Sequence, residues 1–148
     1  MLIARKSTSL VILITAATIT TACVGAPSLA KPVPVEVWRG GDDGLTSRFA
    51  DALEGAFRGS SAFVLSVGKK PGTLIITIPS NVGWKQIGSR TEVHYSVTFT
   101  GTSSQAFGAS KGACWEDQLS KCAVHVLKDA EVVRAKMTRK SALLMKAR

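Results

Sequence analysis

The stretch that most constrains the fold is residues 91–100, TEVHYSVTFT, in which polar and apolar side chains alternate. A period of two is typical of a strand with one buried face, and β-branched and aromatic residues favour that state. We therefore expect a central strand whose apolar face the rest of the chain covers. That face carries Val93, Tyr95, Val97 and Phe99. The opposite face is predicted to stay uncovered, as a candidate contact surface, and carries Glu92, His94, Ser96 and Thr98.

The first thirty residues have the three-part layout of a bacterial secretory signal. Arg5 and Lys6 give a positive start, residues 10–19 form an apolar run, and small residues follow. The run is about half the roughly twenty residues that a membrane-spanning helix needs. The layout predicts export, either to the periplasm or to the periplasmic side of the outer membrane.

Two processing sites are compatible with this leader. Residues 28–30, SLA, place small residues where a signal peptidase acts, so that cleavage after Ala30 leaves Lys31 as the mature start. The alternative is residues 20–23, TTAC, which resemble the lipobox of bacterial lipoproteins and imply cleavage after Ala22 with a lipid on Cys23. Thr20 departs from the lipobox pattern, which usually has an aliphatic residue there. Both sites stay open.

Either route leaves two cysteines in an oxidising compartment, and these are expected to form a disulfide. Cys114 and Cys122 are eight residues apart, which on one helix would separate their Cα atoms by about 12 Å. A disulfide spans at most about 7 Å between Cα atoms. We therefore expect Cys114 to lie in a loop that folds back on the first turns of a helix, with Asp117 as its N-cap.

The net charge of +9 is unevenly distributed. Residues 31–133 carry eleven Lys/Arg and ten Asp/Glu, a balance of +1, and form the predicted domain. Residues 134–148 have no acidic residue and form a basic C-terminal extension of the last helix. An anionic component or a membrane surface is the partner that such a segment favours. Its candidate anion-binding residues are Arg134, Lys136, Arg139, Lys140, Lys146 and Arg148.

Turn residues and periodicity divide the first half of the domain. Strands are predicted at 33–38, 62–67 and 73–78, the last two as a hairpin. A helix is predicted at 45–58, capped by Asp42 or Asp43 and ended by Gly59 in a left-handed conformation. Residues 80–90 are predicted to be irregular, and residues 101–112, which are small and polar, to form a flexible loop.

A second helix is predicted at 118–144, because its apolar residues recur along one narrow stripe. The stripe contains Leu119, Cys122, Ala123, Val126, Ala130, Val133, Met137 and Leu144. The order β-α-β-β-β-α predicts an α+β two-layer sandwich, in which two helices cover one face of a mainly antiparallel four-stranded sheet. The stripe should meet the apolar face of residues 91–100.

Three groups of residues match catalytic or metal-binding patterns weakly. Gly108-Ala109-Ser110-Lys111-Gly112 fits G-x-S-x-G, but the nucleophile elbow of hydrolases needs a strand before it and a helix after it. His94, Cys114, Cys122 and His125 lack the usual zinc-ligand spacing. Asp42 and Asp43 fit helix caps better than a metal site. Lys69, Lys70, Lys85 and Arg90 fit a solvated edge.

The run FADALEGAFRGSSAFVLSV, residues 49–67, resembles small envelope α/β modules. Similar arrangements are the N-terminal domain of the TolB translocation protein and the CsgG-like lipoprotein domains. The resemblance implies a small domain of the bacterial envelope and transfers no functional residue.

The sequence thus favours an exported, non-enzymatic protein that binds or assembles with another envelope component. No cofactor, metal or nucleic acid is expected. Membrane association is expected through a lipidated Cys23 or through the basic C-terminus. The alternatives are a polyanion or membrane-surface binder that uses that basic segment, and a small hydrolase that uses Ser110.

Overall fold

The computed structural model describes residues 31–68 and 70–146, and the burial of side chains as far as residue 139. The predicted leader, both processing sites and Cys23 lie outside the described residues. The elements are β1 (Val33–Arg39), α1 (Gly44–Arg58), β2 (Phe63–Leu65), β3 (Leu74–Ile78), β4 (Gly83–Ile87), β5 (Arg90–Gly101), β6 (Ala106–Trp115), a 3₁₀ turn η1 (Glu116–Gln118) and α2 (Leu119–Lys146).

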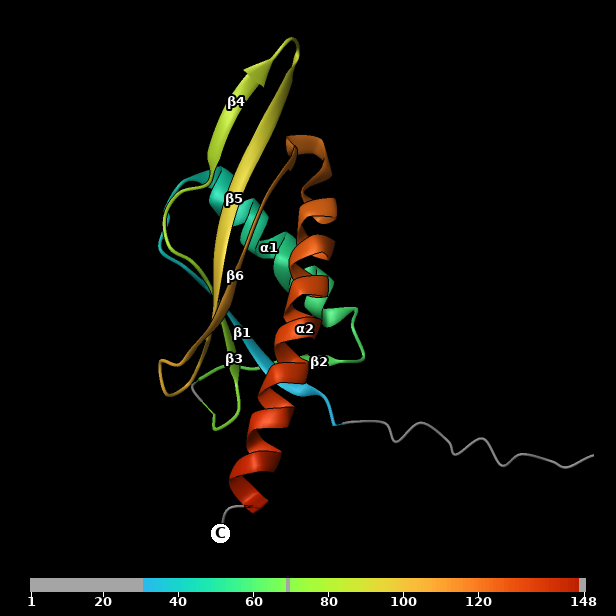
Figure 1. The fold of residues 1–148 in the computed structure, drawn as a ribbon. Coiled ribbons are helices and arrows are strands. Elements are labelled where there is room, and N and C mark those ends of the chain that lie inside the picture. Colours follow the sequence, from blue (N-terminus) through green and yellow to red (C-terminus); the bar gives the residue numbers. More distant parts are fainter. Residues whose placement is uncertain (1–30, 69, 147–148) are drawn as a thin grey trace, which may run out of the picture.

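The described strands form one six-stranded mixed sheet, with α1 and α2 packed on it (Figure 1). The predicted α+β class and the two-helix layer are confirmed. The sheet gains two strands over the expected four, because residues 83–87 and 106–115 also pair with β5. Central β5 has β3 and β4 along one edge and β6 along the other.

The predicted hairpin between the second and third strands is wrong. Both β2 and β3 run parallel to β1, on opposite sides of it. β2 ends level with Val35, where β3 begins. The eight residues between them therefore need only cross the width of β1, about 10 Å, which is well within their reach. A turn-like composition between two strands does not reveal that a third strand separates them.

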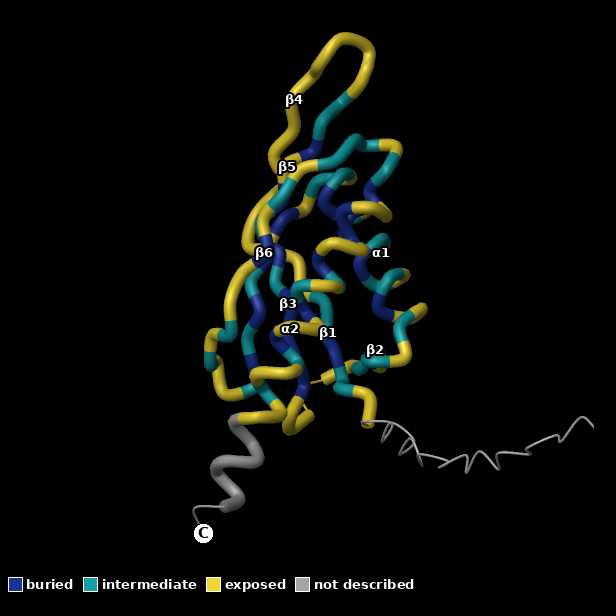
Figure 2. The backbone as a smooth tube through the Cα atoms, turned by 45° about the vertical axis from the view of Figure 1, so that its right-hand side comes forward, coloured by how far each residue is buried: buried dark blue, intermediate teal, exposed yellow. Residues whose placement is uncertain are grey.

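The prediction that residues 80–90 are irregular is also wrong. β4 pairs antiparallel with the first half of β5 around a two-residue turn at Gly88 and Ser89. Gly88 has a φ of +61°, a value that favours glycine and suits such tight hairpins. All five residues of β4 are exposed, so no apolar alternation marks this strand in the sequence (Figure 2).

Residues 106–115 form β6 and are not the flexible loop that their composition predicted. Its Gly, Ala and Ser residues have little intrinsic preference for a strand. The strand forms because it pairs with β5 from Glu92 to Thr100, the longest ladder in the described sheet. Local propensity is overridden here by hydrogen bonding to a strong neighbouring strand.

Helix α1 begins as predicted, where the Asp43 side chain accepts a hydrogen bond from the backbone N–H of Thr46. The helix ends at the predicted position, but Gly59 is right-handed, with φ −78°. The left-handed cap was therefore a wrong prediction. Thr46 is buried, and its hydroxyl accepts from the N–H of Val82, which ties α1 to the segment before β4.

The core lies between the sheet and the helices. The predicted inner face of β5 is buried, with Val93 and Val97 fully inaccessible. The predicted stripe of α2 is buried from Leu119 to Val133, and Met137 packs at its margin. Phe49 of α1 stacks at 5.1 Å on Tyr95, so both helices meet the same strand face. Neither of the described helices covers the opposite sheet face (Figure 1).

Candidate functional site

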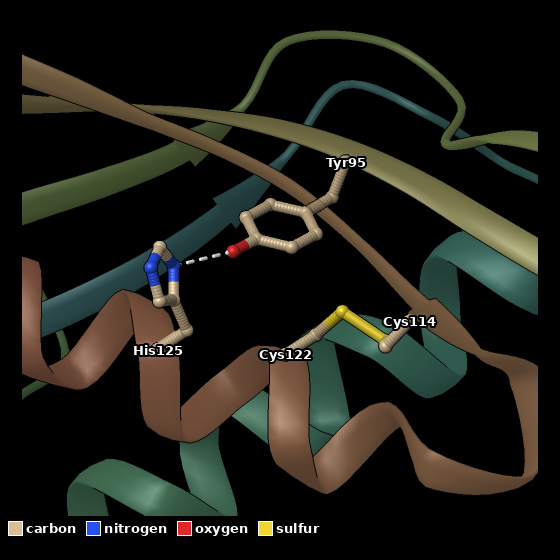
Figure 3. The surroundings of a disulfide bond; sticks show 4 residues. All are labelled: Tyr95, Cys114, Cys122 and His125. Carbon is tan, nitrogen blue, oxygen red and sulfur yellow. Dashed lines mark hydrogen bonds between the residues drawn. A yellow bond between two sulfur atoms is a disulfide. The ribbon is translucent and has the colours of Figure 1, made fainter.

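A disulfide joins the end of β6 to the first turns of α2 (Figure 3). The bond between Cys114 and Cys122 is confirmed, with Cα atoms 5.9 Å apart. Cys114 lies in strand β6, opposite Val93, and not in the loop that was predicted. The bridge therefore fixes α2 against the sheet at the end where the helix begins.

A groove of about 530 Å³ runs beside this bridge, between β6 and α2. Tyr95, Gly112 and His125 line it, together with the lysines Lys111 and Lys121. Position 112 needs a glycine because the Tyr95 side chain passes close to its backbone. A Cβ atom there would lie 2.6 Å from the Tyr95 hydroxyl oxygen. The small residue lets the tyrosine ring extend across β6 toward α2.

Four polar side chains meet behind the groove. The Tyr95 hydroxyl and Nδ1 of His125 share a hydrogen bond of 2.8 Å, in which tyrosine donates when Nδ1 carries no proton. Ser110 donates a hydrogen bond to Asp129, and Asp129 lies 3.7 Å from Nδ1 of His125. The network thus connects β5, β6 and α2 through polar contacts.

Burial raises the pKa of Tyr95 above its ordinary value, and the nearby Asp129 carboxylate adds to the rise. A hydrogen bond with Ser110 acts in the opposite direction. The tyrosine is therefore neutral across the physiological range and keeps its hydroxyl proton. It acts as a structural hydrogen-bonding group at the base of the groove.

Ser110 lies within strand β6, so the strand–turn–helix context of a nucleophile elbow is absent from G-x-S-x-G here. The residue is 3% exposed and faces α2. Its hydroxyl donates to a carboxylate, whereas a serine nucleophile needs a base such as imidazole to take its proton. His125 Nδ1 instead contacts Tyr95.

The predicted sheet-face residues share the side of β5 that α1 and α2 leave uncovered. Glu92 and His94 form an ion pair of 3.0 Å when the imidazole is protonated. Ser96 and Thr98 are half-buried and lie opposite Lys111 and Ala109 of β6. Small side chains lie on this face, because β6 contributes Ala109 and Ala113 beside the hydroxyl residues, and the exposed Lys111 lies between them.

Arginines join the β4–β5 hairpin and α1 to the turn before α2. Arg90 donates twice to Asp117, at 2.8 and 3.1 Å, and stacks 4.3 Å from the Trp115 ring centre. Arg48 of α1 pairs with Glu116. These hydrogen bonds lower the pKa of both carboxyl groups. The predicted cap residue Asp117 is therefore engaged by an arginine from the hairpin.

Five of the six candidate anion-binding residues, all but Arg148, lie along the second half of α2. Lys136 and Arg139 are exposed, and Arg134 is half-buried. The helix continues to Lys146, as the predicted stripe required. The side chains of Lys140, Lys146 and Arg148 lie outside the described residues.

The other candidate groups are divided among separate structural roles. Asp43 caps α1, while the N–H of Asp42 donates to Asn81. His94 lies on the uncovered sheet face, far from His125 on the helix side, and the two cysteine sulfurs are bonded to each other. Among the described residues, no three His, Cys, Asp or Glu side chains are grouped to hold a metal ion. No described helix is both long and apolar enough to cross a bilayer.

Neither models of protein families nor curated proteins give a match to this chain. Among solved structures, it is similar to a PelC dodecamer from Paraburkholderia phytofirmans, with 12% identity and a TM-score of 0.46 over 66% of this chain and 82% of that one. It is also similar to a minor lipoprotein from Acinetobacter baumannii, with 11% identity and a TM-score of 0.31 over 72% and 92% of the two chains. At this level the similarity concerns the general arrangement of elements and carries no information on activity.

Sequence reasoning did not anticipate the network of Tyr95, Ser110, His125 and Asp129. One local signal was present, because His125 and Asp129 are four residues apart and share a helix face. The register that brings Ser110 and Tyr95 to that face depends on β6, which the sequence did not reveal.

Proposed function

We propose that this protein is an exported component of the bacterial envelope that acts by binding another envelope component and not by catalysis. The observation that carries the proposal is the disulfide between Cys114 and Cys122, which agrees with the secretory leader predicted for residues 1–30. Structural disulfides persist in oxidising compartments and are rare in the cytosol.

The uncovered sheet face is the proposed contact surface. Ser96 and Thr98 lie at its centre, with the small residues Ala109 and Ala113 beside them. Short side chains let a partner approach closely and lose little conformational entropy on binding, and the exposed Lys111 beside them adds a positive charge. The partner would be another envelope protein that offers a complementary surface.

A non-catalytic role is supported by the place of Ser110, whose hydroxyl is buried and donates to Asp129. The hydrolase alternative predicts that Ser110→Ala abolishes an activity against a panel of ester and peptide substrates. If wild-type protein turned over a substrate and this variant did not, the binding role would be refuted.

Compartment and contact surface can be tested separately. Cell fractionation and intact mass of the purified protein report export, the mature N-terminus, a lipid on Cys23 and the disulfide. For the surface, a photo-crosslinking residue at Thr98 should capture an envelope protein in living cells. The same residue at Asp51, which is exposed on α1, is the matched control. Equal capture at both positions would exclude the sheet face.

A further inference from the structure

The two ends of the sheet differ in the charges of their connecting segments. We name the end that carries the β4–β5 turn the hairpin pole; its connections are residues 40–43, 79–82, 88–89 and 116–118. The other end is the chain-end pole; its connections are residues 59–62, 66–73 and 102–105, with the start of β1 and the last turns of α2 (Figure 1). Both described ends of the chain thus lie at the chain-end pole.

The connections of the two poles separate acidic from basic residues, while Arg48 and Arg90 of the neighbouring elements pair with Glu116 and Asp117 at the hairpin pole. The hairpin-pole connections contain Asp42, Asp43, Glu116 and Asp117 and no lysine or arginine. The described residues of the chain-end connections include Lys70 and no acidic residue. Lys31 precedes β1, and residues 134–146 of α2 add five basic residues without an acid. The overall net charge conceals this asymmetry.

The basic side chains of the chain-end pole are accessible. Lys31, Lys70, Lys136 and Arg139 are all exposed. Val67, which lies in the connection that crosses β1, is 92% exposed, so this pole also presents an apolar side chain beside its lysines. Basic residues with an interspersed apolar group suit the interface of an anionic bilayer.

We propose that the chain-end pole docks on an anionic lipid surface, with the hairpin pole directed away from it. The mature chain is predicted to begin at Lys31 or eight residues earlier at Cys23, so its first residue lies at the basic pole or is joined to the domain there. Helix α2 is about 40 Å long, several times the Debye length of about 8 Å at physiological salt. The acidic connections of the hairpin pole therefore do not weaken the attraction.

The inference rests on the proposed export, because only an exported chain meets envelope lipids on that side. Its test is co-sedimentation of the purified, processed protein with phosphatidylcholine vesicles and with vesicles in which part of this lipid is replaced by phosphatidylglycerol. A lipid on Cys23 would raise binding to both kinds of vesicle alike. The ratio of binding to anionic vesicles over binding to neutral vesicles therefore measures the contribution of the chain-end pole. We expect preference for the anionic vesicles and its loss at high salt.

The decisive variant is Lys136→Glu/Arg139→Glu, and its matched control is Lys85→Glu/Lys121→Glu, which makes the same charge change at exposed positions nearer the hairpin pole. The first variant should lower the preference for anionic vesicles by at least about tenfold, since each basic residue near an anionic surface adds to the attraction. The control should lower it by less than about twofold. Thermal unfolding of both variants verifies that they are folded.

An equal loss in both variants, or equal binding to neutral and anionic vesicles, would overturn the proposal. So would capture of soluble polyphosphate that depends on Lys136 and Arg139 without vesicle binding, which would identify a polyanion as the ligand. Export is measured independently by fractionation. A chain that binds anionic vesicles but stays in the cytosol would contradict the proposed function and leave the lipid preference intact.

Discussion

The two poles of the sheet are built in different ways. At the hairpin pole, Arg48 and Arg90 pair with the acidic turn Glu116–Gln118, and the disulfide lies beside that turn. At the chain-end pole, the basic side chains stand on connections and on a helix that runs past the sheet (Figure 1). One pole uses its charges to hold elements together, and the other leaves basic charges exposed toward solvent.

This difference suggests that the two poles have different roles. Interactions near the hairpin pole should contribute to the free energy of unfolding, whereas those at the chain-end pole should contribute to binding. Ion pairs between exposed groups are weak, so the stability of the hairpin pole must come mainly from packing and from the disulfide. Substitutions at the two ends can test that separation.

The largest effect is expected from Gly112→Val in β6. The added side chain would occupy the space of the Tyr95 hydroxyl, since even a Cβ would lie 2.6 Å from it. Overpacking and the lost Tyr95 hydrogen bond together should lower the free energy of unfolding by at least about 3 kcal/mol, measured in urea. The control is Gly83→Ala in β4, where the nearest atom to the new Cβ is 3.6 Å away. Similar losses in both variants would contradict the close approach.

The next effect is expected from removal of the disulfide in a Cys114→Ala/Cys122→Ala variant. A loop of this length is worth about 2.5 kcal/mol on the chain-entropy model. Urea unfolding of the variant should match that of wild-type protein in a thiol reductant. An unchanged midpoint would mean that packing alone holds α2 against β6.

A smaller loss, about 1 kcal/mol, is expected from Tyr95→Phe, which removes one buried hydroxyl and keeps the ring. The pKa of Tyr95 is raised in the folded protein, chiefly by burial, so its contribution is complete below the ordinary value near 10 and declines at higher pH. Wild-type stability should therefore fall more steeply above about pH 10 than that of the variant. The same decline in stability with pH in wild type and variant would contradict a raised pKa of Tyr95.

A still smaller effect is expected at low pH from Glu116→Gln/Asp117→Asn. Hydrogen bonds from Arg48 and Arg90 lower the pKa of these carboxyl groups in the folded state. Their contribution is therefore present above the ordinary values near 4 and is lost as the pH falls through the lowered ones. Thermal midpoints should drop less in the variant than in wild type between about pH 5 and pH 3. A steeper drop in the variant would contradict a stabilising contribution from the two ionised carboxyl groups.

The smallest effect on stability is expected from Lys136→Glu/Arg139→Glu at the chain-end pole. Both side chains are exposed, so the free energy of unfolding should change by no more than about 0.5 kcal/mol. The same variant is expected to lose its preference for anionic vesicles. A large loss of stability would show that this pole is also structural and would remove the contrast between the two.

The sequence was informative wherever a pattern depends on near neighbours. The alternation in residues 91–100, the Asp43 cap and the stripe from Leu119 to Met137 each report one element and its buried face. The two cysteines could be paired because they are the two that remain after processing in an oxidising compartment, and helix geometry then placed Cys114 outside the helix. These features follow from local periodicity, capping and the compartment that the leader predicts.

Other elements left little local trace. β6 has the composition of a loop, and β4 is exposed along its whole length, so hydrogen bonds from β5 decide their conformation. A Gly-Ser pair at 88–89 was an available hairpin signal that the irregular assignment overlooked. The parallel pairing of β1 with β2 and β3 depends on contacts between residues distant in the chain.

By itself, the sequence determined the central strand, the two helices, the cysteine pair and the basic composition of the last fifteen residues. Only the tertiary structure decided that Tyr95 reaches across Gly112 to His125, and that acidic and basic connections gather at opposite ends of one sheet. The physical reason is that side-chain periodicity records which face of an element is buried. The order and direction of strands in the sheet, which set the neighbours of each charge, are properties of the whole chain.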